Sequence, residues 1–274
     1  MNEKKDYTIN DFKKVKINDY KVIFNFTYIQ EFLNIVKNKN ITLIDYECFQ
    51  MFGFKNKLDP KRYFSELKNI PFLVNCKTIH YDESNQLFKF DKKITYYYSK
   101  KLEDEKIFYK EVFELAIQVK KFYNKHFIDT VLVMGKDTEI KFSHLANQHL
   151  KVKILKESLE LWDIFNWNRT THLRINGLNN YFSLNQLLKS LPIRKDNIIS
   201  GKEIANKSTQ WFTTLNTIDA KIFFHKAIDH VEYDLEKGLY LLNWLNKLLY
   251  SKYLQNIDEN EYFDNKSLVN IWDF

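Results

Sequence analysis

Short apolar runs alternate with polar segments along most of this chain. Four of these runs have the length and the β-branched and aromatic content typical of strands, and they span residues 41–49, 70–81, 87–98 and 128–135. Only the polar residues 82–86 separate the second run from the third, so these two strands must pair in an antiparallel hairpin. The pattern therefore predicts a sheet that begins with antiparallel strands.

Helical periodicity appears between and after these runs. It predicts helices at residues 25–38, 104–125, 139–150 and 203–212 and a long amphipathic helix from residue 230 onward, whose apolar face carries Val231, Leu235, Leu239, Leu242 and Leu249. The helix at 104–125 can act as a crossover, which lets the strand at 128–135 lie parallel to the strand at 41–49. We therefore expect an α/β fold with a mixed sheet, antiparallel first strands followed by parallel ones, and helices on both faces.

The same pattern suggests how the chain is divided. Residues 1–39 are expected to form an N-terminal helical lead-in, residues 40–250 a single domain, and residues 251–274 a polar C-terminal tail. A chain of 274 residues with 45% hydrophobic residues is large enough to bury a substantial core.

Composition and charge exclude several function classes. The formal net charge of +7 favours an acidic partner such as nucleic acid, although a solvated basic surface would look the same. Cys48 and Cys76 form neither a zinc motif nor a disulfide framework, which predicts a cytoplasmic protein. No segment approaches the ~18 consecutive apolar residues of a membrane span, and P-loop, GxGxxG and GxSxG motifs are absent from the sequence. We therefore expect no membrane partner and no nucleoside-triphosphate, dinucleotide or serine-hydrolase chemistry.

Candidate chemistry begins at the end of the first strand. Asp45 and Glu47 are two residues apart, so a strand would direct both carboxylates to one face. Two carboxylates aimed at one point repel each other unless a cation or a proton lies between them. Oxygen ligands of this kind suit Mg²⁺ or Mn²⁺. The alternative is a strand whose exposed face happens to carry two acids.

A second candidate pair lies on the last helix. His230 and Asp234 are four residues apart and therefore share one helical face. His225 and Asp229 have the same spacing and compete for the same role. We favour the later pair because it leads directly into the apolar helix. The alternative for His230 is a structural residue at the polar border of the core.

The order of these motifs resembles the DEDD superfamily of 3′–5′ exonucleases, which have a ribonuclease-H-like fold, over residues 40–250. The sequence is most similar to the uncharacterised bacterial exonuclease-like domains of that superfamily. Asp45 and Glu47 match its first motif, and His230 and Asp234 match its third in the histidine form. Glu139 stands where the second motif usually has an aspartate, with Asp137 two residues earlier. Asp163 resembles a further acidic element between the second and third motifs.

The resemblance implies a metal-dependent 3′–5′ exonuclease, or a nuclease-like domain, that hydrolyses phosphodiester bonds at DNA or RNA ends. It implies two Mg²⁺ or Mn²⁺ ions held by Asp45, Glu47, Glu139 and Asp234. His230 would orient the attacking water or accept its proton. Because Glu139 replaces an aspartate, the alternative is a catalytically weakened relative that binds nucleic acid or a protein partner. A third possibility is a basic globular protein without a nuclease site.

Overall fold

A computed structural model describes residues 7–17, 20–50, 69–97, 105–134, 137–151, 157–161, 164, 172–175, 200–213 and 217–261. Its larger sheet contains the strands β3 (Ile41–Gln50), β4 (Asn69–Asp82), β5 (Leu87–Tyr97), β6 (Thr130–Val133) and β7 (Glu157–Glu160), in the order β5-β4-β3-β6-β7. The strand β4 pairs antiparallel with both β3 and β5, whereas β6 is parallel to β3 and to β7. The expected mixed sheet is therefore confirmed.

Helices cover both faces of this sheet. The helices α2 (Glu105–Lys125) and α3 (Asp137–Leu150) share a core with the β3 residues Ile44 and Tyr46. On the opposite face, α1 (Phe26–Asn38) and α7 (Thr217–Leu249) share a second core with Ile41 and Leu43. This division follows from the alternation of side chains along β3. The helix α6 (Gly201–Thr213) packs against β3 and α7.

The N-terminal segment differs from the expected helical lead-in. After the short 3₁₀ turn η1 (Ile9–Asp11), the strands β1 (Phe12–Ile17) and β2 (Tyr20–Asn25) form an antiparallel pair, and only α1 is helical. The strand β8 (Leu173–Ile175) and the short β9 (Gln255–Asn256) complete a four-stranded antiparallel sheet in the order β8-β2-β1-β9. Val15 and Phe24 belong to the same core as Leu43 and α7, so this small sheet packs with the rest of the molecule.

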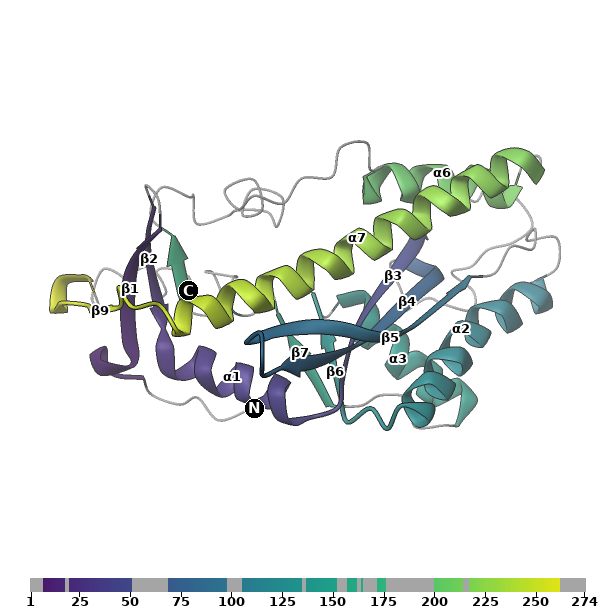
Figure 1. Cartoon of the computed structure of the whole chain (residues 1–274). Coiled ribbons are helices and arrows are strands. Elements are labelled where there is room, and N and C mark those ends of the chain that lie inside the picture. The colour runs from purple at the N-terminus through teal and green to yellow at the C-terminus, as the bar shows by residue number, and fades with distance from the viewer. Residues whose placement is uncertain are drawn as a thin grey trace, which may run out of the picture.

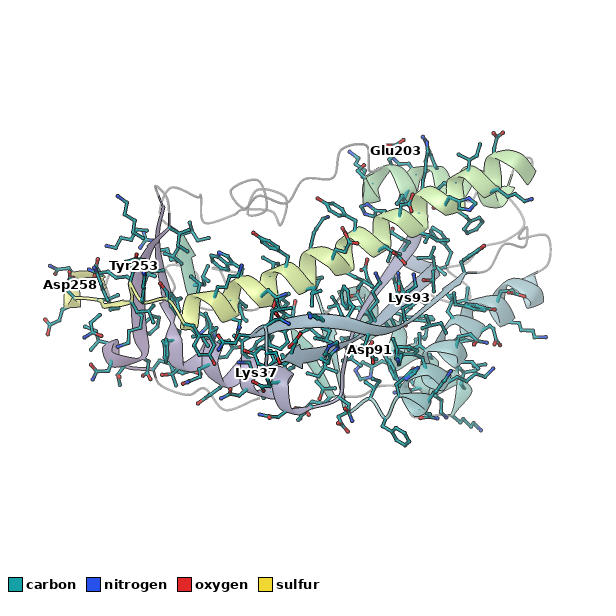
Figure 2. The ribbon with its side chains drawn as sticks, in the orientation of Figure 1. Lys37, Asp91, Lys93, Glu203, Tyr253 and Asp258 are labelled. Carbon is teal, nitrogen blue, oxygen red and sulfur yellow. The ribbon has the colours of Figure 1, made fainter. Side chains whose placement is uncertain are left out.

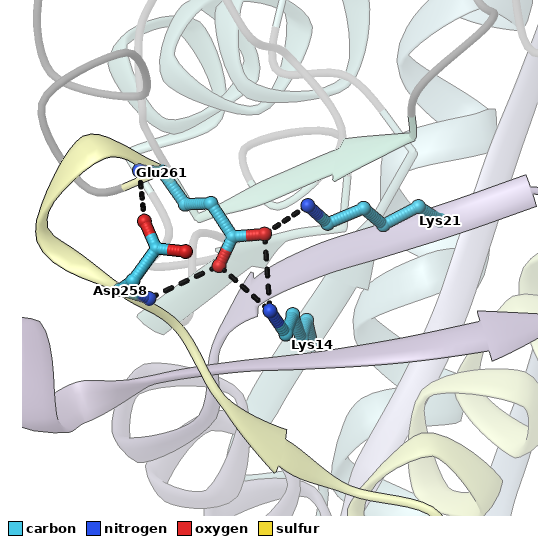
Figure 3. Close-up of polar contacts among 4 residues, drawn as sticks. All are labelled: Lys14, Lys21, Asp258 and Glu261. Carbon is cyan, nitrogen blue, oxygen red and sulfur yellow. Dashed lines mark hydrogen bonds and ion pairs between the residues drawn. The ribbon is translucent and has the colours of Figure 1, made fainter.

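The first residues after α7 are also structured, because β9 pairs with β1. Glu261 lies next to Lys14 and Lys21, and its Oε2 is 2.9 Å from Lys14 Nζ (Figure 3). The backbone N–H of Asp258 donates to Glu261, and that of Glu261 donates to Asp258. These contacts attach the segment after α7 to the small sheet.

The helix α7 is the longest element of the described chain. It begins at Thr217, well before the expected start at residue 230, and includes both His-Asp pairs. Figure 1 shows it running along the length of the molecule, from α6 at one end to the small sheet at the other. Within the described ranges, no helix combines the length and the apolar character that crossing a bilayer would require.

Candidate metal centre

The strand β3 presents two carboxylates to the face that α7 covers. Asp45 and Glu47 alternate with Ile44 and Tyr46, which enter the core beneath α2 and α3. The Tyr46 ring packs edge-on against Phe142 of α3, with ring centroids 5.4 Å apart. This packing fixes the register of β3, and the register in turn directs both acids toward α7. Glu47 is almost completely buried, with 7% of its surface exposed.

The helix α7 adds a histidine and a third carboxylate at the same point. His230 Nε2 lies 3.5 Å from Glu47 Oε1 and 3.4 Å from Asp234 Oδ2. One ligand atom from each of Glu47, His230 and Asp234 falls within 4.8 Å of the other two. Because all three are at least partly buried, this group could hold a metal ion.

The competing pair on α7 does not take part in this group. His225 and Asp229 are exposed, and His225 Nδ1 lies 2.8 Å from the backbone carbonyl oxygen of Lys221. Both pairs lie on one continuous helix, and five residues rotate the later pair by about 140° relative to the earlier one. The geometry therefore places His230 and Asp234, and not His225 and Asp229, beside Glu47.

A glycine allows α7 to approach β3 this closely. A Cβ atom at Gly238 would lie 2.7 Å from Leu43 Cδ2 and 3.1 Å from Met134 Sδ, both shorter than normal contact distances. At the start of α6, a Cβ at Gly201 would lie 3.3 Å from His230 Nε2. The two glycines let α7 and α6 pack tightly where His230 and Asp234 meet Glu47.

Burial and like charge disfavour the ionised forms of the β3 acids. Burial raises the pKa of Asp45 well above its usual range, and the charges of Asp234, Glu47 and Glu139 raise it further. The pKa of Glu47 is also raised well above its usual range, first by burial and then by Asp234 and Glu139, while Lys237 opposes the change. Glu139, on α3, therefore acts on the same group of acids. Such a group favours binding a cation or retaining a proton.

Lys237 is a member of this site that the sequence analysis missed. It is only 5% exposed, and its ammonium forms an ion pair with Asp234 Oδ1. The ammonium also lies 4.3 Å from the centroid of the Tyr233 ring. The available signal was the spacing of His230, Asp234 and Lys237, which places all three on one side of α7.

Asn75 on β4 is a second residue that the sequence analysis missed. It lies directly opposite Asp45 in the antiparallel ladder, so the two side chains share the face beneath α7. Asn75 is completely buried, and neither of its amide atoms has a hydrogen-bond partner within the described part of the chain. A buried amide without partners costs about 1–3 kcal/mol. Such a group beside an acid cluster is expected where a ligand or an ordered water binds.

Further along the same face, Lys77 and Lys93 pair with Glu232 of α7, at 3.5 and 3.3 Å. Lys93 lies on β5 next to α7 in Figure 2. This ion-pair network lies on the flank of α7 opposite Lys237, because Glu232 and Lys237 are five residues apart. It therefore anchors α7 to the sheet without occupying the acid cluster.

Two candidate positions fall outside the part of the chain that the structure describes. Asp163 lies outside the described residues, and so does the side chain of Asp137, although its backbone begins α3.

No protein-family model and no curated protein sequence matches this chain.

Proposed function

We propose that the protein is a metal-dependent nuclease that hydrolyses phosphodiester bonds at the 3′ ends of DNA or RNA. The observation that carries this proposal is the convergence of Glu47, Asp234 and His230 from two elements far apart in the sequence. The order of the larger sheet, with three antiparallel strands followed by two parallel ones, supports a ribonuclease-H-like fold. The net charge of +7 suits a polyanionic substrate.

The residues fit a divalent cation. Two ligand atoms bound to one ion at roughly 2.1 Å lie about 3.0–3.4 Å apart for octahedral to tetrahedral angles. The 3.4 and 3.5 Å separations from His230 Nε2 to the two carboxylates are close to this range. The raised pKa values of Asp45 and Glu47 and the buried amide of Asn75 are also consistent with a bound cation.

Each residue then has a chemical role. Glu47 and Asp234 would hold the ion, with Asp45 and Glu139 completing the two-ion arrangement that the family resemblance implies. A bound divalent ion lowers the pKa of water and neutralises charge on the phosphate. His230 would bind the same ion through Nε2 and so hold its bound water in place. An imidazole bound in this way does not accept a proton at Nε2, so this role replaces the general-base role that the resemblance implies.

Hydrolysis of labelled single strands tests this proposal. We expect 3′-labelled DNA or RNA to release labelled mononucleotide in the presence of Mn²⁺, no release in EDTA, and a loss of at least about 10²-fold in Glu47→Gln. Glu203→Gln is the matched control, because Glu203 is an exposed acid on α6 that pairs only with Lys207 among the contacts described (Figure 2). If Glu47→Gln retained the activity of Glu203→Gln, the proposed site would be wrong.

A second candidate function is a weakened relative that binds nucleic acid or a protein without cleaving it. Two observations favour it: Glu139 stands in the place of the usual aspartate, and the Lys237 ammonium already contacts Asp234. Single-strand binding that persists in EDTA, together with no hydrolysis in Mn²⁺, would support this alternative.

A further inference from the structure

The two carboxylate oxygens of Asp234 have different partners. Oδ2 lies 3.4 Å from His230 Nε2 and faces the group that includes Glu47. Oδ1 contacts the Lys237 ammonium. When one carboxylate bridges two metal ions, each of its oxygens binds one of them. Here, one of the two oxygens already has a cationic partner supplied by the protein.

The position of Lys237 makes this partner difficult to displace. The residue is 5% exposed and lies three residues after Asp234 on the same helix, so the ion pair requires no distant element. The Tyr233 ring lies 4.3 Å from the ammonium and stabilises the charge by a cation–π interaction. A buried ammonium that left Asp234 would lose its ion pair and would leave the half-buried carboxylate without this cation.

From this arrangement we infer that Lys237 supplies the positive charge that a second metal ion would provide, so that the site binds one divalent ion per chain. This inference rests on the proposed function, and it replaces the two metal ions of that proposal with one ion and the Lys237 ammonium. The single ion binds among Glu47, Asp234 Oδ2 and His230. The ammonium remains on Asp234 Oδ1.

Metal binding measured without substrate tests the inference. Equilibrium dialysis or electron paramagnetic resonance of free Mn²⁺ would give the number of ions bound and their Kd for the full chain. We expect the wild type to bind one Mn²⁺. Lys237→Met keeps most of the length of the side chain but removes its charge, so it should bind a second Mn²⁺ or bind the first at least 10-fold more tightly. Lys237→Arg retains the charge and should bind one ion.

Lys247→Met is the matched control. Lys247 is an exposed lysine of the same helix, ten residues or about 15 Å further along. Its substitution should leave both the number of ions and the Kd unchanged. Circular dichroism would establish that each variant is folded. If Lys237→Met failed to fold, Lys237→Gln, which also removes the charge, would take its place with the same expected result. The number of Mn²⁺ ions bound by the wild type would test the inference in either case.

The possible results separate the inference from the proposed function. Two Mn²⁺ ions on the wild type would overturn the inference and leave the metal-dependent nuclease standing. No bound Mn²⁺ would overturn both. One ion on the wild type, with the same number and Kd in Lys237→Met as in Lys247→Met, would show that Lys237 does not take the place of a metal.

Discussion

Gly238→Ala tests whether close packing of α7 on β3 assembles the site. The added Cβ would lie 2.7 Å from Leu43 Cδ2, about 1 Å inside the optimal carbon–carbon separation. Leu43 is completely buried, so it has little room to move. Overpacking of this kind costs about 1–3 kcal/mol, and the better helix propensity of alanine offsets up to about 1 kcal/mol. We therefore expect a net loss of roughly 1–2 kcal/mol, or about 3–6 °C in Tm for a chain of this size.

The same substitution should also weaken metal binding. His230 and Asp234 lie two turns and one turn before Gly238, so a displacement of α7 from β3 moves both away from Glu47. The assay is thermal unfolding followed by circular dichroism, with EDTA and with millimolar Mn²⁺. The wild type should gain stability from Mn²⁺ by mass action, and Gly238→Ala should lose part of that gain.

Two controls isolate the clash. Lys221→Ala introduces an alanine at an exposed position of α7 and should leave both Tm and the Mn²⁺ gain close to wild type. Leu43→Ala removes the Cδ2 atom that the new Cβ would meet, so Gly238→Ala should cost less stability in the Leu43→Ala background than in the wild type. The coupling energy between the two substitutions should be at least about 1 kcal/mol. If Gly238→Ala matched or exceeded the wild type in both Tm and the stability gained from Mn²⁺, close packing of α7 on β3 would not be what assembles the site.

Three further predictions concern individual side chains. The pKa of Asp45 is raised in the folded state, so the folded protein holds this proton more tightly than the unfolded chain. The free energy of unfolding should therefore fall as the pH rises between the pKa of Asp45 in the unfolded chain and its pKa in the folded protein. The expected slope is about 1.4 kcal/mol for each pH unit. Urea unfolding in EDTA should therefore show Asp45→Asn more stable than wild type at pH 8 but not at pH 4, and parallel pH profiles would contradict the burial of this charge. His230→Ala should lower hydrolysis about 10²-fold and His225→Ala should leave most of it, whereas the reverse result would move the site to Asp229. Burial alone would raise the pKa of Glu261, but hydrogen bonds from Lys21, the Asp258 backbone and Lys14 lower it to about 2. Glu261→Gln should accordingly cost roughly 1 kcal/mol at pH 7, and its difference from wild type in thermal unfolding should shrink as pH falls from 4.5 toward 2.

Four of the five strands of the larger sheet were predictable because they carry strong local signals, whereas the four-residue strand β7 was not predicted. The strands β4 and β5 are long, contain many β-branched and aromatic residues, and are separated by one polar turn, and β6 follows a clear helix. The small sheet was not predictable, because lysines alternate with the apolar residues of β1 and its partners come from distant parts of the chain. Val15 and Val22 pair across the β1–β2 ladder, but β9 lies about 240 residues further along the chain.

The site was predictable only in part for a similar reason. Spacing alone placed Asp45 with Glu47 and His230 with Asp234, since each pair lies within one element. The choice of His230 over His225 followed from its position directly before the apolar stripe, and the rotation of the continuous helix α7 explains why only one pair faces Glu47. Lys237 and Asn75 escaped notice because their roles depend on contacts between elements. A lysine on a helix and an asparagine on a strand usually face solvent, and only the packing of α7 on β3 and β4 buries them.

We propose above that Glu47, His230 and Asp234 form a divalent metal site. The most direct test is a crystal structure of the full chain with Mn²⁺, using anomalous scattering to locate the ion. We expect a strong anomalous peak at about 2.0–2.6 Å from a carboxylate oxygen of Glu47, from Asp234 Oδ2 and from His230 Nε2. A fully ordered cluster with no peak at millimolar Mn²⁺, and with the His230 imidazole still between the two carboxylates, would contradict it.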